Sequence, residues 1–271
     1  MELNKIYNEN CLETMGKMPN EFIDLVVTSP PYDNIREYKG YSFDFEKIAT
    51  ELSRVLKVGG VIVWIVNDAT VNGSETLTSF KQALFFQSLG LNIHDTMIYY
   101  KSGMPFPEAT RYNPMFEYMF IVSKGKPKTI NFLNDKKNKY YGDKVARQNG
   151  QRQTDGSILE NSAWKNDKSK EIKEFGIRDN IWYYSTGRGN SSDDEIAFKH
   201  PAIFPEQLCA DHIYSWSNEG DLIYDCFGGS GTTAKMAHLQ KRNWIISELS
   251  PEYVKIAEKR LNGYLAQTFL F

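Results

Sequence analysis

The sequence predicts an α/β domain built on a mostly parallel, twisted β-sheet with helices on both faces. Strand-like and helix-like segments alternate along the first third and the last quarter of the chain. Residues 61–66 (VIVWIV) form a continuous apolar run, which suits a central strand covered on both faces. A glycine-rich turn follows another strand-like segment, at residues 221–227. The 271 residues, 41% of them hydrophobic, suffice for one large domain.

The first 125 residues supply five predicted strands and three predicted helices. The strands are expected at residues 5–10, 22–29, 61–66, 91–101 and 116–125, and the helices at residues 11–18, 45–57 and 76–90. In the helix at residues 45–57, apolar residues recur with a helical period, and Gly59 and Gly60 are expected to end it.

The α/β pattern stops near residue 124 and resumes near residue 199. Residues 130–198 are polar with scattered aromatics, and we expect an inserted, loop-rich recognition region there; a disordered linker is the alternative. The predicted organisation is a catalytic half at 1–129, a target-recognition insertion at 130–198 and a cofactor-binding half at 199–271. The last part contains predicted strands at 221–227 and 243–249 and helices at 234–242 and 250–261.

Charge is distributed unevenly along the chain. The formal net charge is −2, but residues 124–178 contain fourteen Lys or Arg and seven Asp or Glu. A basic segment in an otherwise acidic protein indicates contact with a polyanion, or else a solvated flexible insertion.

Composition argues against several classes of protein. The three cysteines are far apart and the four histidines have no paired spacing, so neither a disulfide framework nor a metal site is predicted. No stretch of about twenty apolar residues predicts a membrane span, and the first ten residues lack the layout of a signal peptide.

Two motifs carry the chemistry. Ser29-Pro30-Pro31-Tyr32 follows a predicted strand, and taken alone it predicts only a stiff turn, because proline cannot donate a backbone hydrogen bond. YDCFGGSGTT, at residues 224–233, places a glycine-rich turn between a strand and a helix, which is an arrangement that holds nucleotide-like ligands. Glu248, at the end of the next predicted strand, can accept hydrogen bonds from both hydroxyls of a ribose; the alternative is a surface carboxylate.

Together the two motifs resemble those of a known family. DCFGGSGT resembles the S-adenosylmethionine-binding motif of DNA amino-methyltransferases, and TSPPY resembles their catalytic motif. The order of catalytic motif, variable region and cofactor motif resembles the permuted β-group of this family. The resemblance implies a Rossmann-like S-adenosylmethionine-dependent methyltransferase fold, S-adenosylmethionine as the cofactor, no metal, and transfer of a methyl group to the exocyclic amine of a base flipped out of duplex DNA.

The resemblance also implies roles for individual residues. The catalytic residues would be Ser29, Pro30, Pro31 and Tyr32. The cofactor-binding residues would be Asn10, Cys11, Thr28, His200, Phe204, Asp225, Phe227, Gly229, Ser230, Gly231, Thr232 and Glu248. His200 and Phe204 lie in HPAIFPEQL, which resembles the family's segment at the methionine end of the cofactor.

The N-terminal segment departs from the family in one position. Where family members often have Gly-Asp-Cys-Leu, this chain has Glu9-Asn10-Cys11-Leu12, and an Asn carbonyl can still accept a hydrogen bond from the adenine amino group. If the first and last predicted strands are neighbours in the sheet, the two ends of the chain close one pocket, with Asn10 at the adenine and Glu248 at the ribose.

The expected mechanism is one of orientation. An exocyclic amine is a weak nucleophile, since its lone pair is delocalised into the ring. Acceptors at Ser29 Oγ and the Pro30 carbonyl would direct that lone pair at the methyl group, and Tyr32 would stack on the flipped base. Ser in this motif is more typical of N4-cytosine enzymes and Asp of N6-adenine enzymes, so we expect N4 of cytosine, with N6 of adenine as the alternative.

Two other functions are alternatives. A methyltransferase acting on RNA or on protein glutamine usually has its proline-proline-aromatic motif after the cofactor motif, which is the reverse of the order here. A nucleic-acid-binding protein without activity would not need both motifs intact.

Double-stranded DNA is the expected partner. We expect contacts with it from Arg36, Lys144, Arg147, Arg152 and Arg188. A cytoplasmic, DNA-associated enzyme of a prokaryote or phage is expected. The sequence leaves open whether a cognate restriction endonuclease accompanies the enzyme and whether it forms a homodimer.

Overall fold

The computed structural model describes residues 1–31, 43–103, 110–143, 151–159 and 171–265. The chain divides into two compact units. The first unit consists of Met1–Asn131 and Asn180–Phe271, and the second of Phe132–Asp179.

A twisted eight-stranded sheet forms the centre of the first unit, in the order β1-β14-β13-β2-β3-β7-β6-β12. The strands are β1 (Lys5–Tyr7), β2 (Ile23–Thr28), β3 (Leu56–Val66), β6 (Asn92–Lys101), β7 (Phe116–Ser123), β12 (Ile181–Tyr184), β13 (Leu222–Asp225) and β14 (Asn243–Ser247). Neighbouring strands are parallel, except that β7 is antiparallel to β3 and β6. One edge of the sheet therefore collects the carboxyl ends of seven strands and the start of β7.

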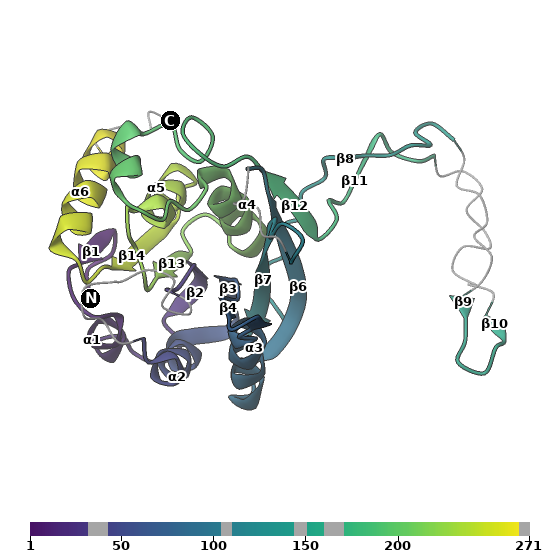
Figure 1. Cartoon of the computed structure of the whole chain (residues 1–271), viewed down its shortest axis with the longest axis horizontal. Helices are drawn as coiled ribbons and strands as arrows, with labels where there is room; N and C mark the ends of the chain where they lie inside the picture. The colour runs from purple at the N-terminus through teal and green to yellow at the C-terminus, as the bar shows by residue number, and fades with distance from the viewer. Residues whose placement is uncertain (32–42, 104–109, 144–150, 160–170, 266–271) are drawn as a thin grey trace. The chain divides into compact units, whose positions relative to one another are not determined.

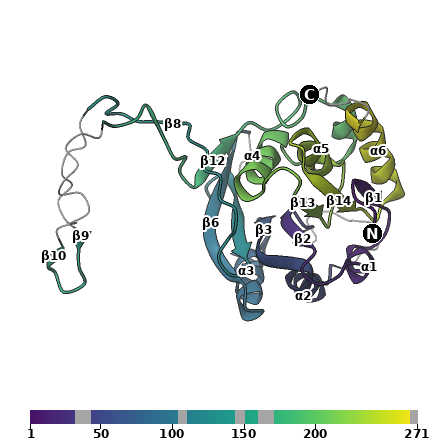
Figure 2. The same cartoon turned by 180° about the vertical axis from the view of Figure 1, so that it is seen from behind.

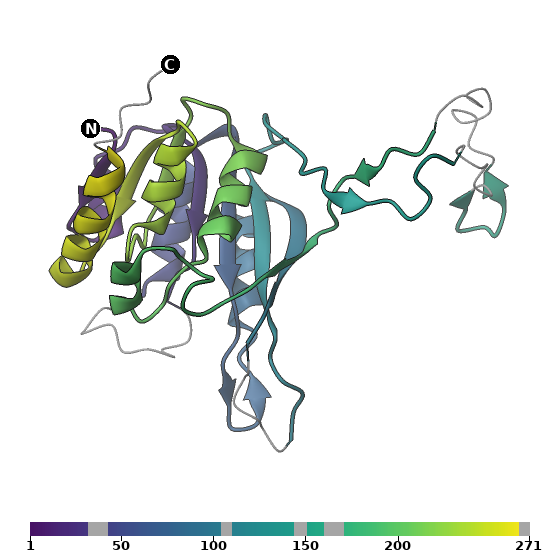
Figure 3. The same ribbon diagram turned by 90° about the horizontal axis from the view of Figure 1, so that it is seen from above.

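Helices cover both faces of this sheet (Figure 1). One layer contains α1 (Cys11–Gly16), α2 (Phe45–Val55) and α3 (Thr78–Ser88), and the other contains α4 (Glu206–Trp216), α5 (Thr232–Leu239) and α6 (Pro251–Leu265). Figure 2 shows the two layers from behind, and Figure 3 shows α4, α5 and α6 side by side. A hairpin of β4 (Thr70–Val71) and β5 (Ser74–Glu75) follows β3, and the 3₁₀ helix η2 (Glu195–Lys199) precedes α4.

The main core lies between the sheet and the layer of α1, α2 and α3. Ile48 and Leu52 of α2, Trp64 of β3 and Phe86 of α3 are fully buried in it. The helical period of apolar residues in α2 thus gives the helix one face that packs on the sheet.

The glycine pair after α2 does not end that helix, in contrast to the sequence prediction. The helix ends at Val55, and Gly59 and Gly60 lie within β3, where its register with β2 is irregular. Gly59 has φ +81°, and a Cβ on Gly60 would lie 3.0 Å from the carbonyl oxygen of Asp24. The glycines therefore permit a close approach of two strands.

The first and last strands are neighbours in the sheet, which is the condition that the sequence set for one pocket closed from both sides. β1 pairs in parallel with β14, with Lys5 opposite Ile245 and Tyr7 opposite Ser247. The Asn8 side chain donates a hydrogen bond of 2.8 Å to the carbonyl oxygen of Glu248. The start of the chain is thus fixed beside the end of β14.

The second unit is shorter than the insertion expected at 130–198. Ile181–Tyr184 form the edge strand β12, which pairs in parallel with β6 of the main sheet, so residues 180–198 belong to the first unit. The second unit contains two short ladders, β8 (Lys136–Lys137) with β11 (Phe175–Gly176) and β9 (Gln151–Arg152) with β10 (Ile158–Leu159). None of the hydrophobic side chains described in this unit is buried.

No helix in the described residues is both long enough and apolar enough to span a membrane.

Candidate active site

A cavity of about 1070 Å³ opens along the carboxyl edge of the sheet. Residues at the ends of β14, β13, β2, β3 and β6 and at the start of β7 line it, together with residues 9–11, 250–253 and much of residues 186–205. Open α/β sheets bind their ligands at this edge. The cavity therefore collects residues that are far apart in the sequence.

The proline turn lies in this cavity. Ser29, Pro30 and Pro31 directly follow β2 and line the wall, and no residue that the structure describes hydrogen-bonds to the Ser29 hydroxyl. Tyr32 and Arg36, predicted to contact the base and the DNA, lie outside the described residues.

Asp225 connects the proline turn to the glycine-rich turn. Thr28 donates a hydrogen bond of 2.7 Å to Asp225 Oδ1, Thr233 donates one of 2.7 Å to Oδ2, and the Phe227 amide donates one of 3.0 Å to Oδ1. Burial raises the pKa of Asp225, although these three hydrogen bonds act to lower it. One buried carboxylate thus joins the end of β2, the end of β13 and the start of α5.

Thr28, which was predicted to bind the cofactor, does not face the cavity. Its side chain is completely buried, does not line the cavity and donates its hydroxyl hydrogen to Asp225. The residue before the proline turn therefore faces inward, since successive residues at the end of a strand point to opposite sides.

The glycine-rich turn, residues 227–232, forms the next part of the wall. Phe227, Ser230 and Thr232 line the cavity, as do Gly228 and Gly229. A Cβ on Gly228 would lie 2.9 Å from the side chain of Ile246, which has to be this close for the turn to pack on β14.

Gly231, also predicted to bind the cofactor, does not line the cavity. It has φ +80°, and an added Cβ would meet Ala257 of α6 at 3.0 Å. Its role is to let α5 begin close to α6.

Glu248 stands at the end of β14 and faces this turn. Its Oε2 accepts a hydrogen bond of 2.8 Å from the Gly229 amide, and its Oε1 accepts one of 2.8 Å from the Ser250 amide. Burial raises the pKa of Glu248, while the two amides act in the opposite direction. A carboxylate has about four acceptor sites, so each oxygen retains capacity for a ligand hydroxyl.

Two further segments complete this end of the cavity. Asn10 and Cys11 line it, and Asn10 Oδ1 also caps α1 by accepting a 2.9 Å hydrogen bond from the Leu12 amide. His200 and Phe204 also line the cavity, and the His200 ring contacts Tyr253 at a centroid distance of 4.3 Å.

The other end of the cavity contains residues that the sequence did not reveal. Asn67 follows β3, Tyr99 and Lys101 end β6, and Glu117 begins β7. Lys101 Nζ lies 2.8 Å from Glu117 Oε1. Strand-end positions were a usable signal for Asn67 and Lys101, whereas Glu117 reaches this edge through the antiparallel direction of β7, which no motif indicates.

The predicted DNA contacts are mostly not described. Lys144 and Arg147 lie outside the described residues, and the Arg152 side chain is not described. Arg188 is exposed at the cavity, with its guanidinium 3.1 Å from the Glu195 carboxylate.

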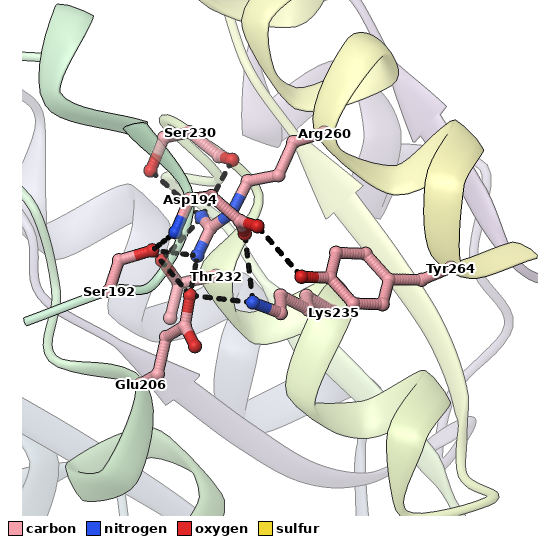
Figure 4. Close-up of polar contacts among 8 residues, drawn as sticks. All are labelled: Ser192, Asp194, Glu206, Ser230, Thr232, Lys235, Arg260 and Tyr264. Atoms are coloured by element: carbon pink, nitrogen blue, oxygen red, sulfur yellow. Dashed lines mark hydrogen bonds and ion pairs between the residues drawn. The ribbon is translucent and has the colours of Figure 1, made fainter. Parts of the chain in front are cut away.

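A charge cluster, defined by Asp194, Glu206, Lys235 and Arg260, lies beside the glycine-rich turn, with both cations buried (Figure 4). Lys235 Nζ is 2.8 Å from Asp194 Oδ2 and from Glu206 Oε1, and Arg260 Nε is 2.6 Å from Asp194 Oδ2. Tyr264 donates a hydrogen bond of 2.7 Å to Asp194 Oδ1. Burial alone would raise the pKa of Asp194, but hydrogen bonds from Lys235, Arg260 and Tyr264 lower it to about 2.

No group of three or more His, Cys, Asp or Glu among the described residues could hold a metal ion.

Comparison with known proteins decides the family. The family model for DNA methylases, which comprises N6 and N4 methyltransferases, matches residues 23–259 of this chain. The chain belongs to the DNA methylase family. This DNA methylase is thus an enzyme that methylates the exocyclic amine of adenine (N6) or cytosine (N4), and the resemblance and fold class inferred from the sequence are confirmed.

Individual relatives agree with this assignment. The chain is 56% identical over 243 residues to the orphan methyltransferase M.BamHII of Bacillus amyloliquefaciens, covering 90% of each chain. It is 28% identical to the type II methyltransferase M.BglII of Bacillus subtilis, covering 96% of this chain and 69% of that one.

Solved structures share the fold. The cytosine-N4-specific PvuII DNA methyltransferase matches with a TM-score of 0.68 and 20% identity, covering 98% of this chain and 87% of that one. A putative DNA modification methylase of Thermus thermophilus, solved with S-adenosylmethionine, matches with a TM-score of 0.62 and 22% identity, covering 97% of this chain and 96% of that one.

The low pKa of Asp194 predicts an acid-sensitive contribution to the stability of this DNA methylase. The pKa is 3.8 in an unfolded chain and about 2 in the fold, so the contribution is complete above about pH 5 and is lost as the pH falls through about 2. The shift corresponds to about 2 kcal/mol.

Asp194→Asn tests this by chemical denaturation at several pH values. Wild type should have a higher free energy of unfolding than the variant. This difference should be about 2 kcal/mol larger at pH 5 than at pH 2. Asp193→Asn, at the exposed neighbouring position, is the control. A wild-type advantage that stays constant over this range would contradict the role of Asp194.

Proposed function

We propose that this enzyme transfers a methyl group from S-adenosylmethionine to N4 of a cytosine in double-stranded DNA. The observation that carries the proposal is the single cavity of about 1070 Å³ that contains the proline turn, the glycine-rich turn and Glu248 together. Single small-molecule sites are typically about 300–1000 Å³, so this cavity has room for a methyl donor and an acceptor base.

The end of the cavity over β13 and β14 fits the cofactor. Gly228 and Gly229 form part of its wall, and Glu248 has acceptor capacity for the ribose hydroxyls beyond its two amide bonds. The remaining lone pair of Asn10 Oδ1 would accept a hydrogen bond from the adenine amino group. His200 and Phe204 would form the wall at the methionine end of the cofactor.

The proline turn would hold the amine that is methylated. The bound cofactor supplies a strongly activated methyl group on its sulfonium. Ser29 Oγ and the Pro30 carbonyl would accept hydrogen bonds from the two amine hydrogens, which would direct the nitrogen lone pair toward the methyl group. The pyrrolidine rings fix the backbone of the turn, so these two acceptors need no reorganisation. Tyr32 retains its proposed role of stacking on the base.

The end of the cavity over β3, β6 and β7 would receive the base. Asn67, Lys101 and Glu117 offer donors and acceptors there, and Tyr99 adds an aromatic ring. A flipped base presents its Watson–Crick edge to such groups. The Ser at position 29 favours cytosine over adenine, because Asp is the more usual residue in N6-adenine enzymes.

The second unit would recognise the DNA sequence. Its described residues include exposed Tyr140, Tyr141 and Phe175 beside lysines 136, 137 and 139. A basic segment with exposed aromatics and no buried hydrophobic side chain has surface suited to a polyanionic partner. The bacterial relatives support a cytoplasmic, DNA-associated location.

Nucleoside analysis tests the proposed reaction. Genomic DNA lacking methylation is incubated with the enzyme and S-adenosylmethionine carrying a labelled methyl group, then digested and separated by chromatography. Label in N4-methylcytosine is expected. Label confined to N6-methyladenine would overturn the choice of base, and no label in either nucleoside would overturn the proposed function.

Two substitutions should separate the two ends of the cavity. Glu248→Ala should raise the Kd for S-adenosylmethionine at least about tenfold while leaving DNA affinity within about twofold, because hydrogen bonds to a carboxylate contribute about 1.5–3 kcal/mol. Ser29→Ala should lower the single-turnover rate at least about tenfold with an unchanged cofactor Kd.

Controls away from the cavity are Glu46→Ala and Ser88→Ala, which should leave both quantities unchanged. The assignment of roles would be wrong if Glu248→Ala bound the cofactor normally, or if Ser29→Ala lost cofactor affinity in parallel with its rate.

A further inference from the structure

Two walls of the cavity face the proposed cofactor end. One is the glycine-rich turn, of which Ser230 and Thr232 line the cavity. The other is the segment of residues 186–205, which we call the strap; it contributes Ser191, His200 and Phe204 among others. The distance between these walls decides whether a ligand contacts both.

Arg260 of α6 hydrogen-bonds to residues of both walls (Figure 4). It does not itself line the cavity. On the turn, its Nη1 donates to the Ser230 carbonyl oxygen at 3.0 Å and to Thr232 Oγ1 at 2.9 Å. On the strap, its Nε donates to Asp194 Oδ2 at 2.6 Å and its Nη2 donates to Ser192 Oγ at 3.2 Å.

The base of the strap is fixed by the same side chain. Arg260 Nη2 also pairs with Glu206, the first residue of α4, to which Ser192 Oγ donates a hydrogen bond of 2.5 Å. The Arg260 side chain is completely buried, so water does not compete for these bonds.

Only an arginine can make this set of contacts. Its planar guanidinium has five donors in a fixed fork, whereas an ammonium is a compact point charge. Lys235 illustrates the difference, because its ammonium contacts the carboxylates of Asp194 and Glu206 but makes no hydrogen bond to the turn. The charges of the cluster balance, with two cations and two anions.

We propose that Arg260 is a positioning residue for S-adenosylmethionine. It holds the glycine-rich turn and the strap at the separation that the cofactor requires, without touching the cofactor. This inference rests on the proposed cofactor and adds a residue that neither sequence motif contains.

The test is calorimetric titration of S-adenosylmethionine into the full chain carrying Arg260→Lys. This variant keeps the charge balance and loses the fork, so the Kd should rise at least about tenfold. Affinity for duplex DNA, measured without cofactor, should stay within about twofold of wild type. Thermal unfolding of each variant gives its Tm.

Arg54→Lys is the matched control. Arg54 of α2 also pairs with a carboxylate, at 2.6 Å from Glu51, and donates to the carbonyl oxygens of Met15 and Met18 at 2.7 and 2.9 Å. It lies in the other helical layer and does not line the cavity. This variant should lower the Tm and leave the cofactor Kd unchanged.

Ser192→Ala removes one strap contact without changing charge, and it decides the question if Arg260→Lys does not fold. Its cofactor Kd should rise severalfold. Ser217→Ala is the control and should leave the cofactor Kd unchanged. Ser217 is a buried serine that accepts a 3.1 Å hydrogen bond from Arg242 Nε and donates one of 2.5 Å to the Ile213 carbonyl oxygen.

The outcomes distinguish this inference from the proposed function. Wild-type affinity in both Arg260→Lys and Ser192→Ala, or an equal loss of affinity in Arg54→Lys, would overturn the positioning role while the proposed function stands. A wild-type chain that does not bind S-adenosylmethionine would overturn both.

Discussion

The buried carboxylate of Asp225 is the interaction on which the rest of the site depends. It accepts hydrogen bonds from Thr28 at the end of β2, from Thr233 at the start of α5 and from the Phe227 amide in the glycine-rich turn. These three elements carry the two halves of the cavity. An ionised group without donors would be costly at this depth, so the carboxylate and its donors constrain one another.

The order of the two motifs in the chain has a physical consequence at this point. The proline turn is reached after only 28 residues, and the glycine-rich turn follows about 200 residues later in the sequence, yet β2 and β13 are paired neighbours. The cavity is closed by β1 pairing with β14, which brings Asn10 and Glu248 to the same end. Long-range strand pairing, rather than either motif alone, assembles the site.

Local patterns in the sequence predicted the central strands, most of the helices and the two motifs, because turn chemistry and apolar periodicity are properties of short segments. Which side of a strand end faces the cavity is not such a property, so the inward direction of the Thr28 side chain could not be predicted. The polar composition of residues 180–198 concealed β12, whose edge position exposes Ile181 and Tyr183. Arg260 was undetectable for a similar reason, since its partners come from three separate segments: the strap, the start of α4 and the glycine-rich turn.

Thr28→Val tests most directly the claim that Asp225 holds the proline turn and the glycine-rich turn in their relative positions. This substitution preserves shape and strand propensity but removes one hydroxyl that donates to Asp225, and Thr28 itself does not line the cavity. Single-turnover methyl transfer to DNA at saturating cofactor is the measurement, with Thr129→Val, at another buried threonine, as the control. The account predicts a rate at least about tenfold below wild type, since about 1–3 kcal/mol is lost when a buried acceptor loses its donor. A wild-type rate in Thr28→Val would contradict it.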